Sequence, residues 1–148
     1  MPFHFPLEVV LRLRQSTEHQ QELLLIEANL QVTRLDQQIR GLDKQSASSS
    51  SRRAHQLETG LKGAELHFEL ACVSALRARR RELERQLAEA EEVREARARE
   101  FREARRQRET METLRNQQHE LHRQHQERQD QRRLDEMLLL RHTYLQRR

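Results

Sequence analysis

The sequence has few residues of the kinds that build a compact core or break a helix. Aromatic residues make up 3% of its 148 positions, tryptophan is absent, and there are only three glycines, two prolines and one cysteine. A compact domain of this size needs more bulky apolar side chains than this, so a globular fold is disfavoured. The single cysteine, Cys72, excludes an internal disulfide framework and fits a reducing compartment.

Long apolar runs are also missing. The longest strongly apolar runs have four residues, Leu23 to Ile26 and Met137 to Leu140. The N-terminal stretch from Met1 to Pro6 lacks a basic region followed by an apolar run. We therefore expect neither a signal peptide nor a membrane-spanning helix.

Charge is abundant and nearly balanced. Charged residues make up 35% of the chain, and 28 basic residues against 24 acidic ones leave a net charge of +4. Disorder is favoured by low hydrophobicity together with high net charge, whereas here the net charge is small and the leucines recur at helical spacing. The composition therefore favours a coiled coil over a disordered chain.

The first half of the chain predicts one helix with a heptad seam, the stripe of apolar positions that faces a partner helix. Residues 1–5 are expected to be an extended lead-in, and helix one to run from 6 to 44, because Pro6 suits a first helical turn. Apolar residues at spacings of three and four form the seam: Leu25, Ala28, Val32, Leu35, Ile39 and Leu42. Continued backwards, the same register meets Gln21, Glu18 and Arg14, so the early seam is either shifted or polar.

The second half predicts a turn followed by a longer helix. Residues 45–56, which are rich in serine, are expected to form the turn, because serine competes with helix for nearby backbone hydrogen bonds. No glycine or proline follows Gly63, so helix two is expected over 57–146. Its predicted seam has the same spacing and consists of Leu57, Leu61, Ala64, Phe68, Ala71 and Ala75, continuing after a slip with Leu76, Leu83, Leu87 and Ala90.

These expectations define an all-α fold of one domain, 1–148: an antiparallel two-helix coiled-coil hairpin with a longer, overhanging C-terminal helix. A turn centred near Ser50 would set residue i opposite roughly residue 100 − i. Helix one would then be exhausted near position 95, roughly, which leaves the rest of helix two without an internal partner. The apolar cluster between Leu134 and Leu145 on this overhang indicates an external partner.

Nothing in the sequence predicts catalysis, so we expect no enzyme, no cofactor and no metal. His119, His122 and His125 are three residues apart, but no acid or thiol completes a ligand set with them. A two-helix hairpin also encloses no catalytic constellation. Nucleic-acid binding through the arginine runs remains an alternative, weakened by the interleaved glutamates and the lack of stacking aromatics.

The chain resembles the flagellar FliJ family, cytoplasmic components of the flagellar type III export apparatus. The resemblance is carried by the N-terminal lead, Phe3-His4-Phe5-Pro6-Leu7, by the Leu- and Arg-rich turn that follows, by the hairpin, and by Asp135-Glu136 near the end of a polar helix. It implies a stalk that engages the hexameric export ATPase ring and links it to the membrane export gate. It also implies export chaperones as further partners and a place at the cytoplasmic face of the inner membrane, peripheral and held through partners.

The resemblance further implies a gate contact on the second helix, of the form Phe-x3-Leu-x2-Ala-x3-His. The matching residues here are Phe68, Cys72, Ala75 and Arg79, of which the second and fourth depart from the family pattern. The hypothesis for the ATPase ring places its contact at the terminal end: Arg132, Arg133, Leu134, Met137, Leu138 and Arg141. A stalk of a virulence type III secretion system or of a V/A-type rotary ATPase is the alternative that shares this architecture.

Overall fold

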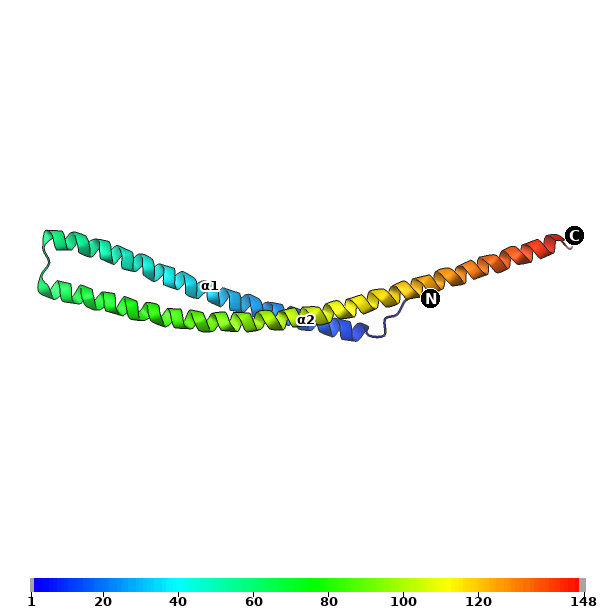
Figure 1. Ribbon diagram of the computed structural model, residues 1–148, viewed down its shortest axis with the longest axis horizontal. Helices are drawn as coiled ribbons and strands as arrows, with labels where there is room; N and C mark the ends of the chain where they lie inside the picture. The colour runs from blue at the N-terminus through cyan, green and yellow to red at the C-terminus, as the bar shows by residue number, and fades with distance from the viewer. Residues whose placement is uncertain (1, 147–148) are drawn as a thin grey trace. The chain divides into compact units, whose positions relative to one another are not determined.

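The structure, a computed structural model, describes residues 2–146 and consists there of two long α-helices. Helix α1 spans Glu8–Thr59 and helix α2 spans Gly63–Gln146, and residues 2–146 contain no strand (Figure 1). The predicted all-α helical hairpin is thus confirmed, as is the greater length of the second helix, 84 residues against 52.

The turn between the helices lies later than expected. The prediction that residues 45–56 form it was wrong, because α1 continues through the serines to Thr59, and helix two begins at Gly63 rather than at 57. Each serine lowers helix propensity only by a few tenths of a kcal/mol, and no glycine or proline interrupts residues 42–59. The true stop is Gly60, whose φ of 97° is a left-handed conformation that terminates helices and suits glycine.

The start of α1 also differs slightly from the expectation. The helix begins at Glu8 instead of Pro6, and the Glu8 amide donates a hydrogen bond to the Phe5 carbonyl at 3.2 Å. Pro6 therefore lies in a turn that leads into the helix. Phe5 is 3% exposed, so the lead-in is anchored by an aromatic side chain just before the helix starts.

The chain divides into two compact units, each with parts of both helices, and one unit comprises residues 19–102. In this unit α1 and α2 run antiparallel on either side of the turn (Figure 1). Asp43 pairs with Arg80 at 2.8 Å and Arg52 with Glu69 at 3.6 Å, so residue i lies opposite about residue 122 − i. The expected register of 100 − i was wrong because it assumed the earlier turn.

The core of this unit confirms the seam predicted on helix one. Leu35, Ile39 and Leu83 are buried together, with Leu42, Leu87 and Ala90 packed against them. The predicted seam on helix two is wrong in its first part, where only Leu61 is half-buried and the other five positions are exposed. The residues that face α1 there are instead at spacings of three and four: Leu66, Glu69, Val73, Leu76, Arg80 and Leu83.

The second unit comprises residues 1–18 together with 103–148. Its buried apolar residues are Phe5, Leu11 and Ala104. Phe3 reaches further along α2, with its ring centroid 5.0 Å from that of His119 and 5.6 Å from that of His122. The N-terminal residues therefore contact α2 as far as about residue 122. The expectation that helix two has no internal partner beyond about residue 95 was wrong. Residues 127–146 are all exposed.

Candidate interaction surfaces

The part of the chain that the structure describes, residues 2–146, holds no group of three or more His, Cys, Asp and Glu side chains able to bind a metal ion. None of its helices is long and apolar enough to cross a bilayer. His119 and His122, considered above as metal ligands, instead lie against the ring of Phe3. These ring contacts hold the N-terminal lead against α2.

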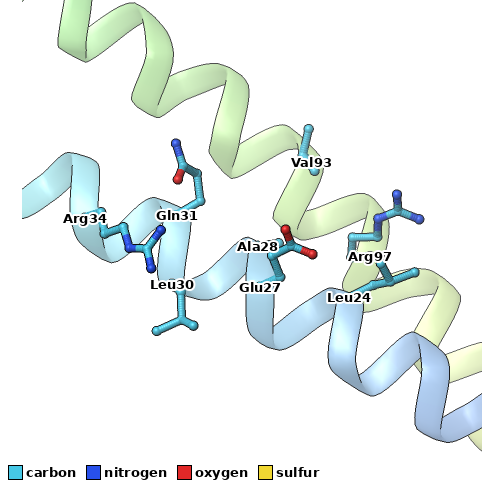
Figure 2. A pocket seen from close by; sticks show the side chains of 8 residues that line it. All are labelled: Leu24, Glu27, Ala28, Leu30, Gln31, Arg34, Val93 and Arg97. Carbon is cyan, nitrogen blue, oxygen red and sulfur yellow. The ribbon is translucent and has the colours of Figure 1, made fainter.

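A furrow of about 460 Å³ lies in the unit 19–102, where α1 passes α2 (Figure 2). Leu24 and Ala28 of α1 and Val93 and Arg97 of α2 line it, whereas Leu30 at its rim points away from α2. Charged side chains, Glu27, Arg34 and Arg97, lie among the apolar ones in its lining. The lining of the furrow is thus shared by both helices.

The four residues suggested for a gate contact lie on α2 in the unit 19–102. Phe68, Ala75 and Arg79 are exposed, Phe68 to 67%, and Cys72 is half-buried. Their spacing of four, three and four residues sets them along one side of the helix. Because the seam toward α1 runs through the half-buried Leu66 and Val73, Phe68 lies outside it, and its side chain is largely exposed.

The six residues suggested for the ATPase ring lie on the exposed segment 127–146. Leu134, Met137 and Leu138 are 56%, 67% and 63% exposed. Four further apolar residues of the segment are exposed to a similar degree: Leu139, Leu140, Tyr144 and Leu145. Arg133 pairs with Asp130 at 3.8 Å on the same helix. So large an apolar surface on a solvated helix is typical of a binding site.

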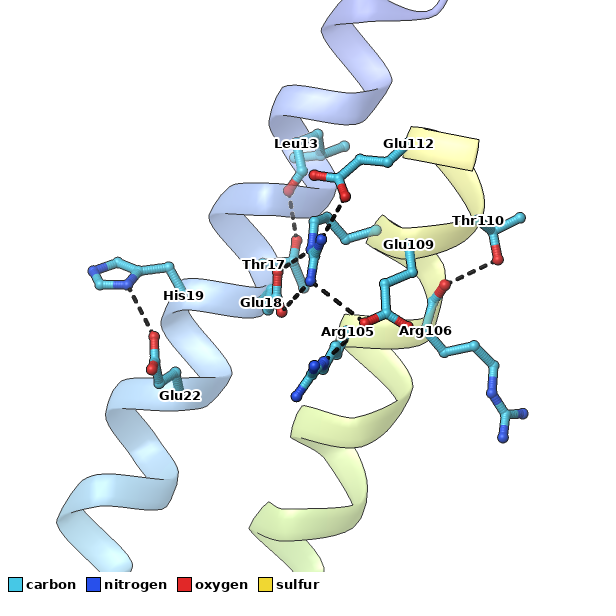
Figure 3. A network of polar contacts seen from close by, with 11 residues as sticks. Leu13, Thr17, Glu18, His19, Glu22, Arg105, Arg106, Glu109, Thr110 and Glu112 are labelled. Carbon is cyan, nitrogen blue, oxygen red and sulfur yellow. Dashed lines mark hydrogen bonds and ion pairs between the residues drawn. The ribbon is translucent and has the colours of Figure 1, made fainter. Parts of the chain in front are cut away.

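A polar layer crosses the seam in the unit that contains residues 1–18 and 103–148 (Figure 3). Arg108 Nε donates a hydrogen bond to Glu18 Oε2 at 2.6 Å and Nη2 donates to Glu18 Oε1 at 3.2 Å, while Nη1 donates to Glu112 at 2.6 Å. The Arg108 and Glu18 side chains are 20% and 18% exposed. The hydrogen bonds that Arg108 donates to Glu18 raise the pKa of Arg108 above its ordinary value, so the guanidinium stays charged.

Arg14 extends this layer, since its Nη1 donates to Gln107 Oε1 at 2.6 Å. Glu8 and Arg115 add a longer ion pair of 3.7 Å. The question whether the early seam is shifted or polar is thereby answered: the register is kept, and Arg14, Glu18 and Gln21 occupy its half-buried positions. The partners on α2 could not be found from the sequence while the turn was placed near Ser50.

The geometry of residues 2–146 defines a class of protein: an all-α helical hairpin with exposed apolar and charged side chains along its helices. A family model described as flagellar FliJ protein matches residues 3–147. The chain belongs to the FliJ family and is therefore a component of the flagellar export apparatus. The members of this family are structural components of that apparatus, and the family is not a known enzyme family. Neither the search of curated proteins nor that of solved structures returns a match.

Proposed function

We propose that the protein is a stalk that engages the hexameric export ATPase ring through its C-terminal segment and contacts the membrane export gate through α2 near the turn. The observation that carries this function is the exposure of every residue from 127 to 146, including an apolar cluster with no internal partner. A single helix of this kind is narrow enough, about 10–12 Å across with its side chains, to enter the centre of a protein ring.

Arginines among the apolar residues support the ring contact. Arg132 and Arg141 flank Leu134, Met137 and Leu138, and all five are exposed. Buried aromatic, aliphatic and arginine side chains dominate the binding energy of most protein interfaces. In this proposal the leucines and the methionine are the apolar anchors, and the arginines meet acidic groups of the ring.

The ring contact is tested with the export ATPase of the same genome, by measuring its hexamerisation and ATP hydrolysis. We expect the full chain to stimulate both, and the chain truncated after residue 125 to stimulate neither. The double variant Leu134→Ala/Leu138→Ala should lose most of the stimulation, whereas Arg128→Ala, exposed on the same segment outside the cluster, should keep it. Unchanged stimulation by the truncated chain would show that the ring is bound elsewhere.

The gate contact rests on Phe68, Ala75 and Arg79, which are exposed on α2, with Cys72 between them. In this proposal Phe68 is the apolar anchor, because its ring is large and solvent-exposed in the free protein. Association with the gate holds the protein at the cytoplasmic face of the membrane through its partners, and export chaperones are further partners there. Binding of the purified cytoplasmic part of the gate should weaken at least about tenfold in Phe68→Ala.

A further inference from the structure

The tip of the hairpin, next to the turn, is packed less well than the rest of the unit 19–102. Leu35, Ile39 and Leu83 form the buried core of this unit, away from the tip. Between Leu42 on α1 and Leu83 on α2, a stretch that the structure describes throughout, no side chain is buried. We call the part of α1 in this stretch, residues 46–59, the tip arm.

The tip arm presents polar residues where the seam needs apolar ones. The heptad register of α1 continues beyond Leu42 through Ser46, Ser49, Arg53 and Gln56, of which the last three are half-buried. On the facing side of α2 the half-buried positions are largely apolar: Leu66, Glu69, Val73 and Leu76. An apolar stripe of α2 is thus covered by serine, arginine and glutamine, which gain little from burying it.

Two polar atoms of the tip arm are buried at a cost. Arg53 Nε and Gln56 Oε1 are inaccessible to solvent and have no hydrogen-bond partner among the described residues. Such atoms lose their hydrogen bonds to water without gaining others, so they oppose the closed arrangement. Ion pairs compensate for this only in part, because Arg52, which reaches Glu69 at 3.6 Å, is itself 62% exposed.

We propose that the tip arm leaves α2 and that an amphipathic helix of the export gate takes its place on Leu66, Val73 and Leu76. This inference rests on the gate contact proposed above. The space that the arm vacates has the shape of a helix, so a helix fits it. An occupant with apolar residues at the levels of Ser46 and Ser49 covers the stripe better than the arm does.

Charge further defines the occupant. The Glu69 side chain is 15% exposed and has Arg52 of the tip arm as its partner. When the arm leaves, this half-buried carboxylate needs another cation, so the incoming helix carries a basic residue at the level of Arg52. Cys72, which lies between the exposed Phe68 and Ala75, is half-buried beside the seam residue Val73.

Hydrogen exchange of the full chain tests whether the arm opens. We expect the amides of residues 46–56 to exchange at least about tenfold faster than those of residues 32–42, because the local free energy of opening is smaller where fewer apolar side chains are buried. Equal protection of the two stretches would overturn the opening, whatever the gate does.

Apolar substitutions in the seam test whether the gate helix displaces the tip arm. In the variant Ser49→Leu/Gln56→Leu the tip arm gains apolar contacts and loses a buried polar atom that has no hydrogen-bond partner. We therefore expect slower hydrogen exchange of its amides and at least about tenfold weaker binding of the purified cytoplasmic part of the gate. Ser51→Leu is the matched control, because Ser51 is exposed and outside the seam register. It should bind as the wild type does.

The outcomes separate this inference from the proposed function. If the filled variant binds the gate as well as the wild type, the arm is not displaced and only this inference is overturned. If the wild-type chain does not bind the gate at all, the gate contact fails and this occupant fails with it. A dimer of the wild type at high concentration, lost in the filled variant, would identify a second copy as the occupant and overturn the gate helix.

Discussion

Glu18 and Arg108 form a two-pronged ion pair across the seam between α1 and α2, with N–O distances of 2.6 and 3.2 Å. Both side chains are about four-fifths buried, at 18% and 20% exposed. They occupy positions that apolar residues fill elsewhere in the seam. Pairing of two charges at a defined level disfavours other registers, because any slip leaves both charges partly buried and unpaired.

Removing one partner of this pair should destabilise the protein. In Arg108→Ala the Glu18 carboxylate keeps its position without its cation, so we expect a loss of about 1–3 kcal/mol in the free energy of unfolding. Urea denaturation followed by circular dichroism measures it. The double variant Glu18→Leu/Arg108→Leu should recover most of the loss, since it replaces the charges by apolar packing. Arg105→Ala, which removes an exposed ion pair with Glu109, should change stability little.

Gly60 and Gly63 provide a second test, because they flank the same turn in different conformations. Gly60 has a φ of 97°, so Gly60→Ala is expected to cost about 1 kcal/mol of stability. Gly63 is the first residue of α2, and a Cβ there meets no atom within 4 Å, so Gly63→Ala should be neutral or stabilising by about 0.4–1 kcal/mol. Equal effects of the two substitutions in thermal denaturation would contradict the assigned turn.

The core of the unit 19–102 should depend strongly on one leucine. Leu83 is 2% exposed and packs with Leu35 and Ile39, so Leu83→Ala is expected to cost about 2–5 kcal/mol. Leu70 lies on the same helix but is 52% exposed, so the same substitution there removes far less buried surface. Denaturation of the two variants should therefore differ clearly, and similar midpoints would mean that Leu83 is not in the core.

Acid should weaken α2 through its surface carboxylates. Hydrogen bonds from Arg85, Arg105 and Arg123 lower the pKa of three glutamates below its ordinary value: Glu82, Glu109 and Glu120. A group whose pKa is lower in the folded state stabilises that state at pH values above its unfolded-state pKa. This contribution is lost as the pH falls through the folded-state pKa.

The thermal midpoint, measured by circular dichroism, should accordingly be flat near neutral pH and fall as the pH drops below about 4.5. The triple variant Glu82→Gln/Glu109→Gln/Glu120→Gln is the control, because glutamine cannot titrate, and its midpoint should fall less. A midpoint that rises on acidification would show that these pairs do not favour the folded state.

Much of the fold was predictable from the sequence, because the spacing of the leucines and the scarcity of glycine and proline predict long helices. The seam from Leu25 to Leu42 was predicted correctly for this reason. The turn was not predicted correctly, because the serines lower helix propensity without ending the helix, whereas Gly60 adopts a φ that only glycine reaches without strain.

That one error explains the others. With the turn near Ser50, Phe68 and Ala75 fell on the seam, whereas the turn at residues 60–62 leaves them exposed and moves the partner of Glu18 to Arg108. The polar layer could be suspected from Arg14 and Glu18 in the seam register, but its second half is separated from them by about ninety residues of sequence. Only the correct register brings the two halves together.

The pairing of residue i with about residue 122 − i also limits how the unit 19–102 can change in length. An insertion in one helix alone would slide every later side chain past its partner and turn apolar positions toward solvent. Relatives that keep the hairpin should therefore gain or lose whole heptads, in α1 and α2 at matched levels, and tolerate unmatched changes only in the turn at residues 60–62. Sequence length in this family is thus expected to vary in paired steps.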